Sequence, residues 1–176
     1  NGKIKGAEIL REINDTLHEE KGTFAELFKP GLRKAMIIGM MLAIFSQITG
    51  INSIIYYAPE IFKSAGFGTE SAFLQTVIIG LIITLFTFVA VVLIDKVGRR
   101  KLLLWGVSGM AISLFAIGLV YHFEWTGGPW LLVSILGFIA CFGASLGPIP
   151  WVIMSEIFPN KTRGLAMSVS VLLLWL

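Results

Sequence analysis

The chain has 176 residues, of which 56% are hydrophobic and 14% are charged. Soluble domains typically contain about 25% charged residues, so this composition argues against a soluble domain and indicates a surface that lies largely in lipid. The net charge of +3 is too small and too dispersed for a nucleic-acid-binding face. Cys141 lies in an apolar run without a CxxC pattern, which favours a buried structural thiol.

Residues 1–30 are polar and carry charges of both signs, so we expect no signal peptide there. Apolar residues recur every three to four positions from Ala7 to Lys21, which predicts a short surface helix packed on its own protein. We interpret residues 1–31 as a cytoplasmic segment. Because the chain begins at Asn1 and stops inside an apolar run at Leu176, we expect a fragment of a longer protein.

Long stretches without charged residues follow this segment, over 35–57, 71–94, 102–123 and 125–155, and another apolar run begins near Leu165. A hydrocarbon core about 30 Å thick is crossed by roughly 20 apolar residues in a helix. Residues 32–176 therefore predict an all-α polytopic membrane protein. We expect four full spans over 32–58, 70–94, 101–122 and 129–154, and the start of a fifth from 163.

Along the chain, predicted loops that are rich in Lys and Arg alternate with loops that are poor in them. Lys and Arg precede the first span, join the second to the third and follow the fourth, whereas the loop after the third span carries only His122 and Glu124. Cytoplasmic loops are enriched in Lys and Arg, so we expect residues 1–34 and the basic loops to be cytoplasmic. Trp125 and Trp130 then fit an aromatic belt near the outer face.

The middle of the first span is polar at a depth where lipid cannot satisfy polar groups. On a continuous helix, Gln47 and Asn52 flank opposite edges of one polar face, which is formed by Ser46, Thr49, Gly50, Ser53, Tyr56 and Tyr57, and Ile48, Ile51 and Ile55 fill the back. Hydrogen bonds to a neighbouring helix would account for the hydroxyl groups. The two amides combine donors with acceptors, which suits a neutral ligand rich in hydroxyl groups.

The fourth span contains Gly147, Pro148 and Pro150, followed directly by Trp151. Two prolines remove backbone donors and break a helix, and a broken helix inside a membrane usually lines a cavity or acts as a hinge. The ring of Trp151 can stack on the C–H face of a sugar, with an interfacial tryptophan as the alternative. We therefore predict a hinge at Gly147, Pro148 and Pro150.

Charged residues on the predicted cytoplasmic side suggest a second functional cluster. Asp95 and Glu156 are the acids on this side beyond residue 34, and each has arginines within a few positions. We predict a conformational latch formed by Asp95, Arg99, Arg100, Glu156 and Arg163. Plain topology signalling is the alternative, since it requires only the basic residues.

The spans carry no catalytic constellation. Their interiors contain no charged residue, and the spans contain no metal-ligand spacing of His, Asp or Glu and no GxxxxGK[ST] phosphate loop. We therefore predict no enzyme activity, no metal and no cofactor.

Four motifs in chain order resemble the sugar porter family of the major facilitator superfamily. They are Gln47 to Asn52 with Tyr56 and Tyr57, Asp95 to Arg100, Gly147 to Trp151, and Glu156 to Pro159 with Arg163 and Gly164. The resemblance implies the second half of such a protein, preceded by its intracellular helical segment. The spans would be helices seven to ten and the start of eleven.

The resemblance also implies a central sugar site shared with a first half that is missing here. Gln47 and Asn52 would bond sugar hydroxyls, Trp151 would pack on the ring, and Trp175 falls at a frequent site position of helix eleven. Thr49 and Tyr56, from the same motif, are further candidate contacts. The family commonly has a glutamine at the position of Ser46, an asparagine at that of Ile83 and a polar residue at that of Leu174, so the site of this sequence offers fewer amides.

The sequence thus predicts a secondary transporter of a hexose- or pentose-like sugar in the plasma or inner membrane. Alternating access would proceed as proton symport or as uniport. The expected partners are the sugar, the bilayer, protons and the missing half, with no nucleic acid. A porter of a related polyol such as an inositol and a non-transporting sugar sensor on the same fold are the alternatives.

Overall fold

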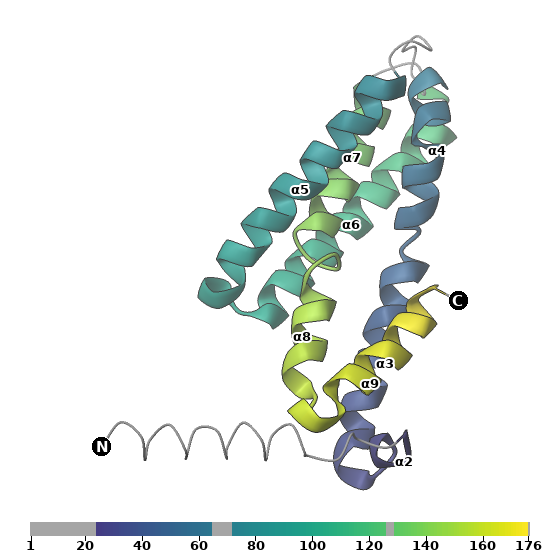
Figure 1. The fold of residues 1–176 in the computed structure, drawn as a ribbon. Helices are drawn as coiled ribbons and strands as arrows, with labels where there is room; N and C mark the ends of the chain where they lie inside the picture. The colour runs from purple at the N-terminus through teal and green to yellow at the C-terminus, as the bar shows by residue number, and fades with distance from the viewer. Residues whose placement is uncertain (1–23, 65–71, 126–128, 176) are drawn as a thin grey trace.

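The computed structural model describes residues 24–64, 72–125 and 129–175, and this part of the chain consists of helices without strands (Figure 1). The predicted helix over Ala7–Lys21 lies outside the described residues. The helices are α2 (Phe24–Leu27), α3 (Pro30–Ile48), α4 (Ile51–Ser64), α5 (Ala72–Val97), α6 (Arg99–His122), α7 (Pro129–Gly143), α8 (Ile149–Ile157) and α9 (Asn160–Trp175).

Two of the predicted spans are divided into two helices each. The first consists of α3 and α4, and the fourth of α7 and α8. Among the described residues, three stretches are long and apolar enough to cross a membrane, namely 30–63, 76–97 and 99–122, whereas α7 by itself is shorter. The two breaks face one another near mid-height of the molecule (Figure 1).

The helices pack into two groups. The upper bundle comprises α4, α5, α6 and α7 around a cluster that includes Phe62, Met110, Leu131, Ile135 and Phe138. The lower bundle comprises α2, α3, α8 and α9 around a smaller cluster of Leu27, Met36, Met154, Phe158 and Ala166 (Figure 1). A third cluster, formed by Ala90, Ile94, Leu102 and Ile149, joins the ends of α5 and α6 to α8.

Small residues allow α6 and α7 to approach closely. A Cβ atom built on Gly106 would lie 2.1 Å from Cβ of Ser145, and one on Gly109 would lie 2.5 Å from Sγ of Cys141. Close approach through small residues is the usual basis of helix association inside a membrane. Cys141, which we predicted to be a buried thiol, is half-buried at this contact.

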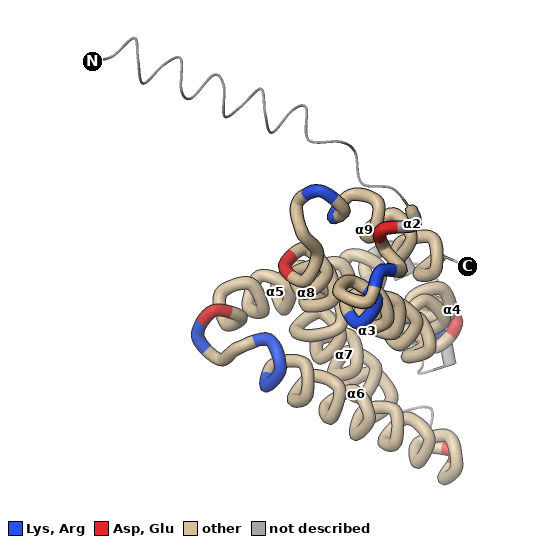
Figure 2. The backbone as a smooth tube through the Cα atoms, turned by 90° about the horizontal axis from the view of Figure 1, so that it is seen from below, with Lys and Arg blue, Asp and Glu red and all other residues tan. Residues whose placement is uncertain are grey.

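Basic residues gather at helix ends. Lys and Arg lie at the start of α3, around the α5–α6 connection and at the start of α9 (Figure 2). The α5–α6 connection is a tight turn at Gly98, whose φ of 88° lies in the left-handed region that favours glycine. The long apolar faces between these ends carry many exposed hydrophobic side chains, as expected for surfaces in contact with lipid.

Candidate functional site: a cavity between two helix breaks

The break between α3 and α4 is short and is set by one glycine. Gly50 has a φ of 77°, which interrupts the helix after a last turn in which the Gly50 N–H donates to the Gln47 carbonyl at 3.1 Å. The new helix starts at once, since Ile54 N–H donates to the Gly50 carbonyl at 3.0 Å. A non-glycine residue adopts this backbone conformation at a cost of roughly 1–2 kcal/mol.

This break brings the two predicted amides together. Nδ2 of Asn52 donates to Oε1 of Gln47 at 2.9 Å, and Nε2 of Gln47 donates to the backbone carbonyl of Leu174 in α9. Our expectation that Gln47 and Asn52 lie on opposite edges of one face was therefore wrong. On a continuous helix they would be separated by about 140°, but the left-handed residue between them changes the direction of the chain.

The break between α7 and α8 is longer and is followed at once by the second of the two prolines. Residues 144–148 form turns, and the N–H groups of Ser145 and Gly147 both donate to the Phe142 carbonyl, at 3.0 and 2.9 Å. Pro148 is the N-cap of α8 and Pro150 lies in its first turn. Proline is well placed there because the first N–H groups of a helix need no intrahelical acceptor.

A cavity of ≈ 200 Å³ lies between the two breaks and the end of α9. Of the predicted sugar contacts, the structure brings together Gln47, Asn52, Trp151 and Trp175 in its lining. The remaining lining residues are Ser46, Ile51, Ile55, Phe142, Leu146, Gly147 and Leu174. Sequence reasoning placed Ile51 and Ile55 behind the polar face, and this was wrong for the same reason as for the amides.

Two other candidate contacts lie outside the lining. The Thr49 hydroxyl donates to the Ser46 carbonyl at 2.6 Å, and its side chain borders a separate apolar hollow between α3 and α6. Tyr56 is 72% exposed and is not among the residues that line the cavity. The Ser46 hydroxyl is buried and donates to the Ala43 carbonyl at 3.0 Å, so the hydroxyls of Ser46 and Thr49 both bond their own helix.

The cavity therefore combines few polar groups with large apolar surfaces. Amide donors and acceptors come from Gln47 and Asn52, and aromatic surfaces come from Trp151 and Trp175. Its described lining contains no charged side chain. Such a site can hydrogen-bond a neutral hydroxylated molecule and pack against its C–H faces, but it offers no countercharge to an organic acid.

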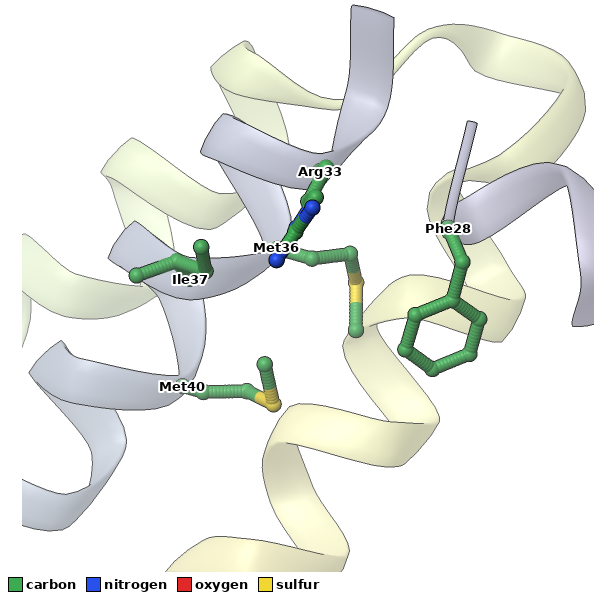
Figure 3. Close-up of a pocket in the computed structure, with 5 residues that line it drawn as sticks. All are labelled: Phe28, Arg33, Met36, Ile37 and Met40. Atoms are coloured by element: carbon green, nitrogen blue, oxygen red, sulfur yellow. The ribbon is translucent and has the colours of Figure 1, made fainter. Parts of the chain in front are cut away.

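A larger hollow of ≈ 380 Å³ lies at the start of α3 and is less suitable for such a ligand. It is lined by Phe28, Arg33, Met36, Ile37 and Met40, and Phe28 faces the two methionines across it (Figure 3). Arg33 is the polar member of this lining, which contains neither an amide nor a hydroxyl side chain.

The predicted latch residues are only partly joined. Arg99 at the start of α6 forms an ion pair with Glu156 in α8, and Nε of Arg163 donates to the Phe158 carbonyl at 3.4 Å. Within the part of the chain that the structure describes, Asp95 and Arg100 have no ion-pair partner within 4 Å. Sequence reasoning missed Glu26 in α2, which lies 3.6 Å from Nζ of Lys161 in α9, because it considered only the acids after residue 34.

The helical fold and the cavity define a polytopic membrane protein with a candidate small-molecule site. The family model described as "Sugar (and other) transporter" matches residues 3–176. The chain therefore belongs to this family of transporters, as its motifs predicted.

Relatives and a solved structure agree with this assignment. The chain is 48% identical to an arabinose-proton symporter of Bacillus subtilis (strain 168), over 99% of this chain and 38% of the relative. It is 41% identical to a D-xylose-proton symporter of Escherichia coli (strain K12), over 99% of this chain and 35% of the relative. The chain thus spans little more than a third of the length of these two relatives.

Its structure is similar to that of the major facilitator superfamily proton:xylose symporter XylE bound to 6-bromo-6-deoxy-D-glucose. The TM-score is 0.78 at 41% identity, with 96% of this chain and 35% of that chain covered. The predicted major facilitator superfamily fold is confirmed.

Proposed function

We propose that the protein is a secondary transporter that moves a hexose- or pentose-like monosaccharide across the plasma or inner membrane by alternating access. The observation that carries this proposal is the cavity, in which Gln47 and Asn52 form a hydrogen-bonded amide pair beside Trp151 and Trp175. The relatives' names, arabinose-proton and D-xylose-proton symporter, support a sugar as the substrate and protons as the coupling ion.

In this proposal, the two amides bond sugar hydroxyls and the tryptophans pack on the ring. The cavity is open on one side, and a first half of the protein, outside this chain, supplies its other wall. The hinge at Gly147, Pro148 and Pro150 lets α8 move relative to α7. Lys and Arg lie at the start of α3, at the α5–α6 connection and at the start of α9 (Figure 2). Because cytoplasmic ends of membrane helices are enriched in basic residues, this supports a cytoplasmic position for residues 1–34.

Uptake by the full-length protein in proteoliposomes tests the function directly. We expect saturable uptake of labelled arabinose, xylose or glucose, with acceleration by an inward proton gradient in the case of symport. Uptake of myo-inositol in place of all three sugars would identify the polyol porter. Sugar binding without flux would identify the non-transporting sensor and contradict the proposal.

Cysteine labelling tests the orientation separately. A cysteine placed near Glu124 should react with an impermeant reagent from outside, whereas one near Lys96 should not. The reverse pattern would show that the proposed orientation is wrong.

A further inference from the structure

The end of α9 lies against α3, close to the break between α3 and α4 (Figure 1). On the face that α3 and α9 share, a Cβ atom built on Gly39 would lie 3.3 Å from Oγ of Ser170, which is fully buried. Leu174 lies about one turn further along α9, and its main-chain carbonyl accepts a hydrogen bond from Nε2 of Gln47. The packing of α9 on α3 thus brings a main-chain acceptor to the edge of the cavity.

The Leu174 carbonyl determines which way round the Gln47 amide lies. A carbonyl oxygen only accepts, and its two lone pairs allow this bond in addition to one within its own helix. The NH₂ end of the Gln47 amide therefore faces α9, and its oxygen faces Asn52. Asn52 must then donate through Nδ2, as its 2.9 Å bond to Oε1 of Gln47 shows. The hydrogen bonds form a chain with one direction, from Asn52 through Gln47 to the main chain of α9.

This direction decides which atoms of the two amides remain for a ligand. Each NH₂ group has a second N–H, and Oδ1 of Asn52 accepts no hydrogen bond from the described residues. A ligand hydroxyl can therefore donate to Oδ1 of Asn52, and a neighbouring hydroxyl can accept from an N–H of the pair. If the Gln47 amide were reversed, Asn52 would have to turn its oxygen toward Gln47 and away from the ligand.

We propose, given the sugar site described under the proposed function, that the main-chain carbonyl of Leu174 is a positioning group for the substrate amides. Asn52 consequently meets the substrate through its carbonyl oxygen. A displacement of α9 removes the acceptor that holds the Gln47 amide, so the position of α9 controls the affinity of the site. The side chain at position 174 needs no polar group for this role, because the acceptor belongs to the main chain.

The variant Gln47→Glu in the full-length protein tests the direction of the chain. A protonated Glu carboxyl donates to the Leu174 carbonyl and accepts from Asn52, as glutamine does, whereas a carboxylate cannot donate. An ordinary Glu carboxyl is mostly protonated at about pH 4 and ionised at about pH 9. The probes are labelled arabinose, xylose and glucose. We expect the affinity of the variant, relative to the parent at the same pH, to fall about 10-fold as the pH rises over this range.

The opposite pH profile is expected if Gln47 contacts only the sugar. A carboxylate accepts hydrogen bonds from hydroxyl groups more strongly than a neutral amide does, so the relative affinity would then stay constant or rise with pH. Either of these results would overturn the proposal. The described lining of the cavity contains no ionisable side chain, so the introduced carboxyl is the group that titrates within it.

Two further variants locate the effect. Asn52→Asp should lose affinity in the same direction, because an ionised Asp carboxylate cannot donate to Oε1 of Gln47. Gln75→Glu makes the same substitution as the first variant in the first turn of α5, a helix that contributes no residue to the described lining. Its affinity relative to the parent should not change with pH, and a fall equal to that of Gln47→Glu would contradict the proposal.

Thermal unfolding without sugar separates this inference from the proposed function. Protonated Gln47→Glu keeps the bond between α3 and α9 and the ionised form loses it, so its Tm relative to the parent should fall as the pH rises. A parent that binds no sugar would show that the proposed function is wrong, and the Tm profile would still test the contact with Leu174. A Tm profile equal to that of Gln75→Glu would show that the Leu174 carbonyl does not hold the Gln47 amide.

Discussion

The helices of the upper bundle approach more closely, and bury a larger cluster, than those of the lower bundle. In the upper bundle, backbones approach closely at Gly106 and Gly109, and the buried cluster is large. The lower bundle has a smaller cluster, a less close approach at Gly39, whose added Cβ would lie 3.3 Å from Ser170 Oγ, and an ion pair between Glu26 and Lys161 at its end. Dispersion contacts at short range are lost steeply when atoms separate, whereas exposed ion pairs contribute little and exchange easily with water. The upper bundle is therefore the better candidate for a rigid body.

Both helix breaks lie where the two bundles meet, and so does the cavity that they line. The amides flank the α3–α4 break, and the prolines and Trp151 lie at the start of α8, after the α7–α8 break. A ligand held at this junction contacts both bundles at once. The comparison implies that substitutions in the upper bundle should chiefly change stability, and those at the junction should chiefly change binding or turnover.

The largest effect is expected for Gly106→Ala. Its Cβ would lie 2.1 Å from Cβ of Ser145 and 3.0 Å from the Cys141 carbonyl, so α6 and α7 must separate. We expect a loss of about 3 kcal/mol in folding free energy, measured as a lower Tm in detergent. Gly118→Ala on the same helix is the control, because nothing lies within 4 Å of its added Cβ. Equal Tm values for the two variants would contradict the close contact.

The next largest effect concerns the amides at the junction. Gln47→Ala and Asn52→Ala each remove one partner of a sugar hydroxyl, which costs about 1–3 kcal/mol, or roughly a 5- to 150-fold loss of affinity. Isothermal titration of the full-length protein with its sugar measures this change. Ser53→Ala is the control, because Ser53 is exposed next to Asn52 in α4 and does not line the cavity. Unchanged affinity in both amide variants would remove them from the site.

A smaller effect is expected for Gly50→Ala. No atom lies within 4 Å of the added Cβ, so the cost of roughly 1–2 kcal/mol comes only from the left-handed backbone. If the variant relieves this strain by forming a continuous helix, Gln47 and Asn52 are separated. We then expect both the folding free energy and the affinity for sugar to fall. Gly80→Ala in α5 is the control, since Gly80 is helical and its Cβ is also unopposed. A variant with full affinity would show that the break is not needed for the amide pair.

The smallest effect on stability is expected for Glu156→Gln. The Arg99–Glu156 pair is roughly half-exposed and contributes about 0–1 kcal/mol, but it joins α6 of the upper bundle to α8 of the lower one. If it acts as a latch, transport should slow and the inward-open state should gain population at unchanged sugar affinity. Glu60→Gln is the control, because its partner Lys63 lies in the same helix. If the two variants have the same turnover, the latch hypothesis is wrong, and Arg99 and Glu156 affect only the membrane topology.

Much of the molecule follows from local sequence. Uncharged runs place the long helices, because a lipid-exposed helix excludes charge over its whole length. The prolines at 148 and 150 predict the second break, because proline cannot donate within a helix. The Gly50 break was not predicted, although this glycine stands inside the polar motif. A glycine in a membrane helix is as often a close packing contact as a break, and periodicity does not distinguish the two cases.

What the sequence by itself determined was the class of protein, the approximate positions of its helices and four residues of the cavity lining, Gln47, Asn52, Trp151 and Trp175. Composition, charge alternation and motif order are properties of short segments, so they can be read along the chain. Only the tertiary structure decided that Asn52 bonds Gln47, that the Arg99 guanidinium meets Glu156 57 positions away, and that Ser145 packs against Gly106. These contacts depend on the direction of the chain after each break and on the packing of distant helices, which no local pattern specifies.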